Sequence, residues 1–281
     1  MKLISFSRKG ANSFGAIVNE GVVDLGARLN LTDLGAALRQ VGIDAIKELA
    51  SKSPADFDLA KFEAFRPVVA DPDKILCAGL NYDEHVQETK KQRTERPTIF
   101  MRVAASQVGH EQSIVLPPES DRLDYEGEIA VVIGKGGRRI AEDQAYQHIA
   151  GFACYNDGSI RDWQLHTSQW GPGKNFESTG GFGPTLVTVD EIGENEVLTL
   201  ETRLNGQVMQ HATTDMLIFS IPTLIAYCSS FVTLVPGDVI VTGTPGGVGA
   251  KRNPPVFMRD GDVVEVEVSK LGILRNHIRA E

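Results

Sequence analysis

The stretch Asp124-Tyr125-Glu126-Gly127-Glu128, followed directly by the apolar run Ile129–Gly134, decides the fold of the central part of this chain. The run has the length and composition of a buried strand. Side chains two residues apart in a strand point to the same face, so Glu126 and Glu128 would lie side by side at the end of this strand. Two carboxylates at that spacing repel each other unless a positive charge lies between them. The stretch therefore predicts a buried strand that ends in a cation-binding pair.

A third carboxylate, Asp157, comes directly after the next apolar run, Ile149–Asn156. Three carboxylates without a neighbouring His or Cys are typical of a site for a hard cation with oxygen ligands. We therefore predict a Mg²⁺ site at Glu126, Glu128 and Asp157, with Mn²⁺ or Ca²⁺ as less favoured ions. A solvated acidic strand end is the alternative interpretation of the Glu-x-Glu pair alone.

Composition and charge exclude several classes of protein. The chain has 281 residues, 42% hydrophobic and 23% charged, as in an ordinary globular protein. Its formal net charge is −9 and its densest basic segment, Lys90–Arg96, is short, so we expect no nucleic-acid partner. No apolar run approaches the roughly 18 residues of a membrane span, and Arg8-Lys9 come too early for a signal peptide. We expect a cytoplasmic protein with no membrane partner, whose three cysteines are buried and reduced.

The order of predicted elements indicates two units. Residues 1–70 read as a small α+β domain, with strands at Leu3–Ser7, Ala16–Val18 and Val22–Leu25 and helices at Thr32–Gln40 and Asp44–Lys52. Residues 71–281 are rich in short β-type runs, and their longest helical pattern spans Asp215–Ser230. The predicted strands of this second unit are Ile75–Gly79, Ile129–Gly134, His148–Tyr155, Thr185–Thr188, Thr199–Leu204, Val239–Thr242 and Val263–Val268. We expect an α+β fold that is mostly β, with a sandwich or barrel-like core rather than a doubly wound sheet.

His85 and Glu88 are candidates for proton transfer. They lie three residues apart, so a helix over residues 83–91 would place them on one face. A carboxylate beside an imidazole orients the ring and raises its basicity, which suits a general base. An incidental pair on a surface helix is the alternative.

Four more polar residues could bind a substrate. Gln164 could hydrogen-bond it, and Lys174 could meet a carboxylate or a developing oxyanion from a glycine-rich turn. The turn that contains Thr244 could present its hydroxyl and backbone N–H groups to a ligand carboxylate. Arg161 could instead hold its acidic loop together. An exposed lysine in a turn is the alternative for Lys174, which the local sequence alone favours, and a structural turn is the alternative for Thr244.

In order along residues 71–281, these segments resemble the fumarylacetoacetate hydrolase family. The matching motifs are Gly79-Leu80-Asn81-Tyr82…His85…Glu88, Asp124-Tyr125-Glu126-Gly127-Glu128, Asn156-Asp157…Arg161-Asp162…Gln164, Gly173-Lys174, Leu204-Asn205-Gly206, Pro236-Gly237-Asp238, Thr242-Gly243-Thr244-Pro245-Gly246-Gly247-Val248-Gly249, and Gly261-Asp262 with Leu271-Gly272.

The resemblance implies a mixed β-roll catalytic domain, a small N-terminal domain and a homodimer. It implies Mg²⁺ or Mn²⁺ on the three carboxylates and a water-activating His85–Glu88 pair on a short lid helix. It also implies that Gln164, Lys174 and Thr244 contact substrate, and we place Tyr82 and Arg161 with them as substrate-binding candidates.

Two departures from the family pattern lie near the expected pocket. Arg102 stands where many relatives carry a lysine, and Gly180-Gly181-Phe182-Gly183-Pro184 replaces a common Pro-x-Gly-Pro. Both departures leave the identity of the substrate open.

From these observations we predict a metal-dependent hydrolase that cleaves a C–C bond in a 2,4-dioxo acid, of the acylpyruvate or diketo-deoxy sugar acid type. The products would be pyruvate and a carboxylic acid. In this reaction the cation would stabilise the departing enolate, His85 would deprotonate water, and Lys174 and Gln164 would stabilise the oxyanion. The alternative is a decarboxylase or isomerase of a 2-oxo diacid, such as oxaloacetate or 2-hydroxyhepta-2,4-diene-1,7-dioate, that uses the same metal site. A binding module with structural Ca²⁺ is the third hypothesis.

Overall fold

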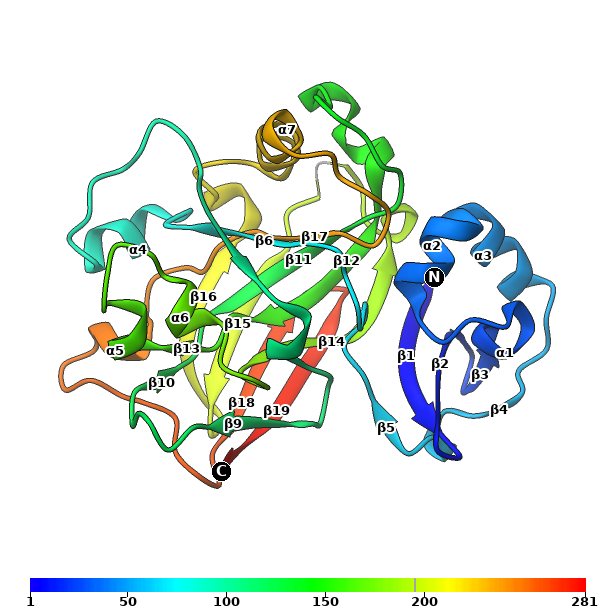
Figure 1. The fold of residues 1–281 in the computed structure, drawn as a ribbon, viewed down its shortest axis with the longest axis horizontal. Helices are drawn as coiled ribbons and strands as arrows, with labels where there is room; N and C mark the ends of the chain where they lie inside the picture. Colours follow the sequence, from blue (N-terminus) through cyan, green and yellow to red (C-terminus); the bar gives the residue numbers. More distant parts are fainter. Residues whose placement is uncertain (195) are drawn as a thin grey trace.

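Strand β11 (Gly127–Ile133) lies inside the largest sheet of the protein, and all seven of its residues are buried. The computed structural model describes residues 1–194 and 196–281. Within this described part, twelve strands form the large sheet, a further five form a second sheet, and two short strands pair separately (Figure 1). The fold is α+β, as the sequence predicts.

The large sheet runs from the N-terminal segment to the segment that carries the predicted lid. Its main path is, in spatial order, β4 (Phe57–Asp58), β3 (Gly21–Asp24), β2 (Ala11–Val18), β1 (Lys2–Arg8), β14 (Gly180–Thr188), β12 (Ile149–Asn156), β11, β17 (Val239–Val241), β6 (Ile75–Gly79) and β7 (Thr98–Arg102). Off this path, β5 (Ala64–Phe65) pairs with β1, and β8 (Gln107–Val108) pairs with β14.

The second sheet packs against β11 and β12 and consists of β16 (Gln207–Thr213), β15 (Thr199–Leu204), β18 (Val263–Val268), β19 (Gly272–Ala280) and β9 (Ser113–Leu116). The separate pair is β10 (Leu123–Asp124) with β13 (Ser159–Ile160). Of these strands, β9, β10, β13, β16 and β19 were not predicted. In β16 and β19, charged and polar residues hide the alternating pattern of a half-exposed strand.

The α-helices are short and connect or cover the sheets: α1 (Leu25–Leu29), α2 (Leu34–Gln40), α3 (Gly42–Ser51), α4 (Asp83–Glu88), α5 (Arg161–Gln164), α6 (Gly171–Lys174) and α7 (Ile221–Phe231). The 3₁₀ segments are η1 (Leu59–Lys61), η2 (Ala104–Ser106), η3 (Glu142–His148), η4 (Val189–Glu191), η5 (Thr214–Met216) and η6 (Gly249–Lys251). None of the described helices combines the length and the apolar character that a membrane span requires.

Helix α7 begins six residues later than the predicted start at Asp215. Ser220 caps the helix by accepting a hydrogen bond from the Thr223 N–H, and Pro222 occupies the first turn. Proline fits the first turn of a helix because its missing N–H would have no partner there. The residues before Ser220 form η5 instead.

Alternate side chains of β11 enter two different hydrophobic clusters, which explains why its sequence is apolar at every position. Ile129, Val131 and Ile133 pack into the cluster that includes residues of α7 and of the second sheet. Ala130 and Val132 pack into the cluster that includes residues of β1, β2 and α2. A strand that is buried on both faces reads as a continuous apolar run.

The N-terminal unit extends the large sheet directly. Lys2 and Leu3 of β1 pair with Val187 and Leu186 of β14 in antiparallel register. In Figure 1 the unit lies beside the rest of the chain, with β1 facing β14. The division into a domain of residues 1–70 and one of residues 71–281 stays a prediction.

Candidate active site

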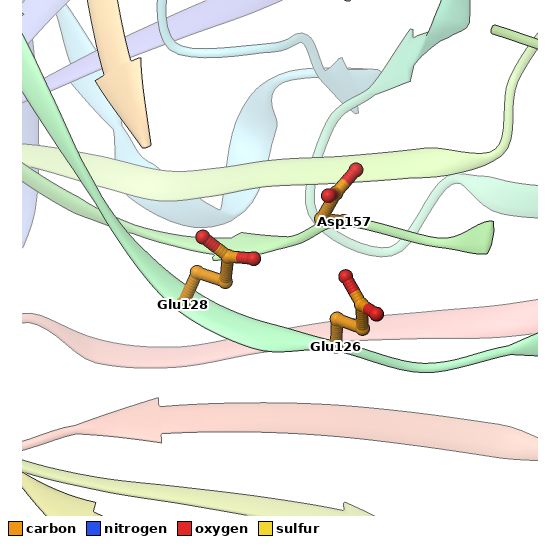
Figure 2. Close-up of side chains that lie close together, drawn as sticks. All are labelled: Glu126, Glu128 and Asp157. Atoms are coloured by element: carbon orange, nitrogen blue, oxygen red, sulfur yellow. The ribbon is translucent and has the colours of Figure 1, made fainter. Parts of the chain in front are cut away.

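Three carboxylates meet where β11 and β12 come together. Glu128 is the second residue of β11, Glu126 precedes that strand, and Asp157 follows β12. The two strands pair antiparallel with Gly127 opposite Asn156, so the start of one lies beside the end of the other. One oxygen from each of Glu126, Glu128 and Asp157 lies within 4.8 Å of the others, and all three residues are buried (Figure 2). The structure thus brings together the residues that the sequence predicts for the metal site.

Three cations surround this acidic cluster. The Lys174 ammonium lies 2.6 Å from Glu126 Oε2 and 2.6 Å from Asp157 Oδ2. An Arg161 nitrogen lies 2.6 Å from Glu126 Oε1. Arg102 is fully buried and donates a hydrogen bond to Asp157 Oδ1. The sequence predicts neither contact of Lys174. Glu126 lies 48 positions and Asp157 lies 17 positions before Lys174, so these residues meet only in the folded chain.

Glu128 differs electrostatically from Glu126. Burial raises the pKa of Glu126, but the charges of Arg161 and Lys174 outweigh burial and hold its pKa below the ordinary value. Burial and the charges of Asp157 and Glu126 raise the pKa of Glu128 well above the ordinary value. The Glu128 oxygen Oε2 accepts a hydrogen bond from the Gly243 N–H at 2.5 Å. Of these two glutamates, Glu128 is therefore the one whose charged form the protein stabilises less.

The three residues fit a divalent cation. They offer hard oxygen ligands only, and a carboxylate oxygen can accept a second interaction beside an existing hydrogen bond. An additional positive charge next to Glu128 would relieve the repulsion that raises its pKa. Exposed acidic groups are common without a bound ion, but these three are buried, and Glu126 and Glu128 line a cavity.

A cavity opens beside the acidic cluster. Glu126, Glu128, Arg161 and Lys174 line its charged part. Its other lining residues include the apolar or aromatic Phe100, Leu165, Trp170 and Val248 and the candidates His85, Gln164 and Thr244. A concave site with apolar walls and a few convergent polar groups is typical of a small-molecule site.

His85 lies on α4, and its ring is held by Glu88. His85 Nδ1 is 2.6 Å from Glu88 Oε1, and the ring lines the cavity. Glu88 Oε2 accepts a hydrogen bond from the Gly247 N–H at 2.9 Å. The predicted helix of residues 83–91 ends at Glu88, but it is long enough to place both side chains on one face. The Nδ1 contact leaves the other ring nitrogen available for proton transfer.

The remaining sequence candidates differ in their surroundings. Gln164 accepts a hydrogen bond from Arg161 at 2.9 Å. The Thr244 hydroxyl donates to Gly127 O at 3.0 Å and accepts from Gln210 Nε2 at 2.8 Å. Tyr82 is buried at the start of α4 but does not belong to the lining of this cavity. Burial raises the pKa of Tyr82, so its phenol stays protonated.

Four backbone N–H groups of residues 243–250 donate hydrogen bonds to carboxylates of the chain itself. The sequence suggests that this turn presents them to a ligand. Instead, Gly249 and Ala250 donate to Asp124, each at 2.8 Å, while Gly243 and Gly247 donate to the two glutamates described above. Arg161 also donates to Asp124, through Nε at 2.8 Å. The buried Asp124 therefore positions Arg161 and the 249–250 backbone. In the sequence, only its place in the acidic motif could have indicated this role.

Comparison with known proteins gives matches over most or all of the chain. The family model described as "Fumarylacetoacetate (FAA) hydrolase C-terminal" matches residues 74–279. Oxaloacetate tautomerase Fahd2a, mitochondrial, of Rattus norvegicus is 44% identical over 215 residues, which cover 76% of this chain and 69% of that protein.

Solved structures match over the whole chain. A crystal structure of a Mycobacterium smegmatis protein named after HpcE is 34% identical, has a TM-score of 0.90, and covers 100% of this chain and 99% of its own. Maleylpyruvate hydrolase from Sphingobium sp. SYK-6, in complex with manganese(II) ion and pyruvate, is 26% identical with a TM-score of 0.81, at 100% and 99% coverage.

Proposed function

Because the chain belongs to the fumarylacetoacetate hydrolase family, as its motifs predict, we propose that it interconverts the keto and enol forms of a 2-oxo diacid of the oxaloacetate type. The observation that carries this proposal is the 44% identity to an oxaloacetate tautomerase, over 69% of that protein. The acidic cluster, the cavity and the His85–Glu88 pair support the same chemistry.

The hydrolytic reaction predicted from the sequence is wrong. That prediction used the His85–Glu88 pair to activate a water, but the curated relative at 44% identity is a tautomerase. A carboxylate-held imidazole serves carbon–hydrogen proton transfer as well as water activation. The residues therefore could not distinguish the two reactions, and the isomerase alternative replaces the hydrolase.

In the proposed reaction His85 moves one proton. The ring takes the proton from carbon 3 of the keto acid, and the C–H electron pair forms the double bond between carbons 2 and 3. The carbonyl electrons move to oxygen, which receives the proton from the imidazolium to give the enol. Glu88 orients the ring and stabilises its protonated form.

Lys174 and the carboxylates prepare the site for the negative charge that develops on oxygen. The charges of Asp157 and Glu126 outweigh burial and raise the pKa of Lys174, so its ammonium remains charged next to the cavity. Glu126, Glu128 and Asp157 would hold Mg²⁺ or Mn²⁺, and such an ion would supply a Lewis acid that favours the enolate. The homodimer implied by the family stays part of this proposal, and analytical ultracentrifugation measures it.

The test follows the ultraviolet absorbance of enol-oxaloacetate with purified protein, Mg²⁺ or Mn²⁺, and then EDTA. We expect the protein to accelerate ketonisation and EDTA to remove the acceleration. A pyruvate assay of the same samples detects decarboxylation separately. An unchanged rate of ketonisation with the metal-loaded protein would contradict the proposed function.

A further inference from the structure

Two lysines lie together at the cavity and have no task in the reaction described above. Lys91 follows α4 by three residues, and Lys251 ends η6. Both side chains line the cavity, although both residues are exposed. The Lys91 ammonium lies 4.4 Å from the centre of the Trp170 ring, so a cation–π contact holds it at the cavity.

The charges of Lys91 and Lys251 are not neutralised by the protein. In the part of the chain that the structure describes, no ion pair joins either lysine to a carboxylate. Burial lowers the pKa of Lys91, and the positive charge of Lys251 lowers it further. Two neighbouring cations without an anion repel each other, and a bound anion would relieve that repulsion.

The other lysine and arginine of the cavity already contact carboxylates of the chain. Lys174 contacts Glu126 and Asp157, and Arg161 contacts Asp124 and Glu126, although Arg161 Nη2 has no hydrogen-bond partner. Among the lysines and arginines that line the cavity, Lys91 and Lys251 are therefore the two without a carboxylate partner in the part of the chain that the structure describes.

We propose that Lys91 and Lys251 bind the distal carboxylate of a dianionic 2-oxo acid whose reacting end lies at the acidic cluster. This inference rests on the proposed function and goes further, because it assigns substrate specificity to two residues outside the catalytic machinery. The site then favours 2-oxo diacids over 2-oxo acids with a neutral distal end. Lys91 and Lys251 act on binding and leave the proton transfer to His85.

The first experiment compares oxaloacetate with its 4-ethyl ester, which has the same 2-oxo carboxylate group and no distal charge. The variants are Lys91→Met, Lys251→Met and the double variant, and Lys90→Met is the matched control, because Lys90 is exposed and does not line the cavity. We expect the double variant to lose about tenfold or more in kcat/KM for oxaloacetate, mainly through KM. We expect less than about a twofold change for the ester and for the control. Lys91→Arg keeps charge and stacking on Trp170 and should retain the preference for oxaloacetate.

The second experiment measures binding without turnover. Calorimetry with Mg²⁺-loaded protein compares malate with lactate, which lacks the distal carboxylate. We expect the wild type to prefer malate and the double variant to lose that preference. The assignment of the lysines would be overturned if the double variant lost kcat/KM equally for oxaloacetate and the ester and lost affinity equally for malate and lactate. It would also be overturned if the double variant lost neither. A wild type that prefers malate but does not ketonise enol-oxaloacetate would reject the proposed function and leave the lysine assignment supported.

Discussion

The three acids of the cluster have different partners, and this difference decides what each can do. Glu126 and Asp157 each form ion pairs with two cationic side chains. Glu128 has the Gly243 N–H as its hydrogen-bond donor in the described part of the chain. The pKa of Glu128 is raised by burial and by the other two carboxylates, so this residue gains most from a bound cation.

Glu128→Gln should weaken metal binding without loss of stability in the metal-free protein. Gln keeps an oxygen for the Gly243 N–H and removes the charge that repels the other two carboxylates. We expect the dissociation constant for Mn²⁺ to rise at least about tenfold, measured by calorimetry. Glu119→Gln is the matched control, because Glu119 is exposed. Unchanged affinity for Mn²⁺ would reject Glu128 as a ligand.

His85→Gln should lower the rate of ketonisation by about 10²–10⁴-fold, because it removes the proton-transfer group. Glu88→Gln should have a smaller effect on kcat, since an amide still orients the ring but does not stabilise its protonated form. Glu84→Gln on the same helix is exposed and should retain wild-type activity. A His85→Gln variant with full activity, at unchanged metal affinity, would exclude His85 as the base.

At the scale of single residues, the sequence predicts the contacts between side chains that lie a few positions apart. Glu126 and Glu128 are two positions apart, and His85 and Glu88 are three positions apart, so strand and helix periodicity bring each pair together. The contact between Arg102 and Asp157 could not be predicted, because it joins β7 to the residue after β12. The sequence marks Arg102 only as a departure from the family pattern.

At the scale of elements, close packing of β11 against β15 depends on Gly127. A Cβ atom at Gly127 would lie 1.9 Å from the Thr202 hydroxyl oxygen and 3.3 Å from Thr202 Cβ. Thr202 is fully buried, so its side chain has no space to move away. The glycine of the acidic motif therefore lets the second sheet pack against the strand that carries Glu128.

Gly127→Ala should lower the free energy of unfolding by about 1–3 kcal/mol, the usual cost of overpacking a core. Urea denaturation measures the change. Gly171→Ala is the matched control, because a Cβ at Gly171 has no atom within 4 Å. The double variant Gly127→Ala/Thr202→Ala should recover part of the loss, since the colliding hydroxyl is gone. Equal stability of both single variants would contradict the packing argument.

Three strands with a clear apolar run or a clear alternation of apolar and polar residues were predicted with exact bounds. Strands Ile75–Gly79, Thr199–Leu204 and Val263–Val268 have the predicted bounds. Helix α1 was not predicted, and its first residue Leu25 was included in the predicted strand Val22–Leu25, because Leu25 continues the apolar run of β3. Local patterns could not separate the two, since the helix begins only where Asp24 caps it.

At the scale of the whole molecule, the N-terminal unit and the rest of the chain share a sheet and a second contact at His110. The Phe65 ring of β5 packs edge-on against the His110 ring at 4.8 Å. His110 Nδ1 accepts a hydrogen bond from the Arg275 N–H at 3.0 Å, which requires an unprotonated Nδ1. Pairing of β1 with β14 could not be predicted, because the sequence does not indicate which distant strand completes a sheet.

His110 should make stability depend on pH. Burial lowers the pKa of His110, and the charge of Arg275 lowers it further, against an opposing effect of Glu111. The unfolded chain takes up a proton near the ordinary pKa of about 6.5, whereas the folded protein resists it. The stabilising contribution is therefore present above that pH and is lost as the pH falls from about 7 through 6.5 towards the folded-state pKa.

Urea denaturation between pH 7.5 and about 5 measures this dependence, in the range where histidine titrates. His110→Asn keeps an acceptor for the Arg275 N–H and removes the titrating ring, so its free energy of unfolding should fall less steeply with decreasing pH. His211→Asn is the control, because His211 is exposed. Identical slopes for the wild type and His110→Asn would exclude this role of His110.

The two contacts of Glu88 link the position of α4 to proton transfer by His85. One carboxylate fastens α4 to the 243–250 turn through Gly247 and also steadies the His85 imidazole. Any movement that lifts α4 off that turn breaks the Gly247 contact and moves His85 and Glu88 together, because both residues lie on α4. The proton-transfer pair is then in place only when α4 contacts the 243–250 turn. A reactive enolate would therefore form only in the covered cavity, away from bulk water.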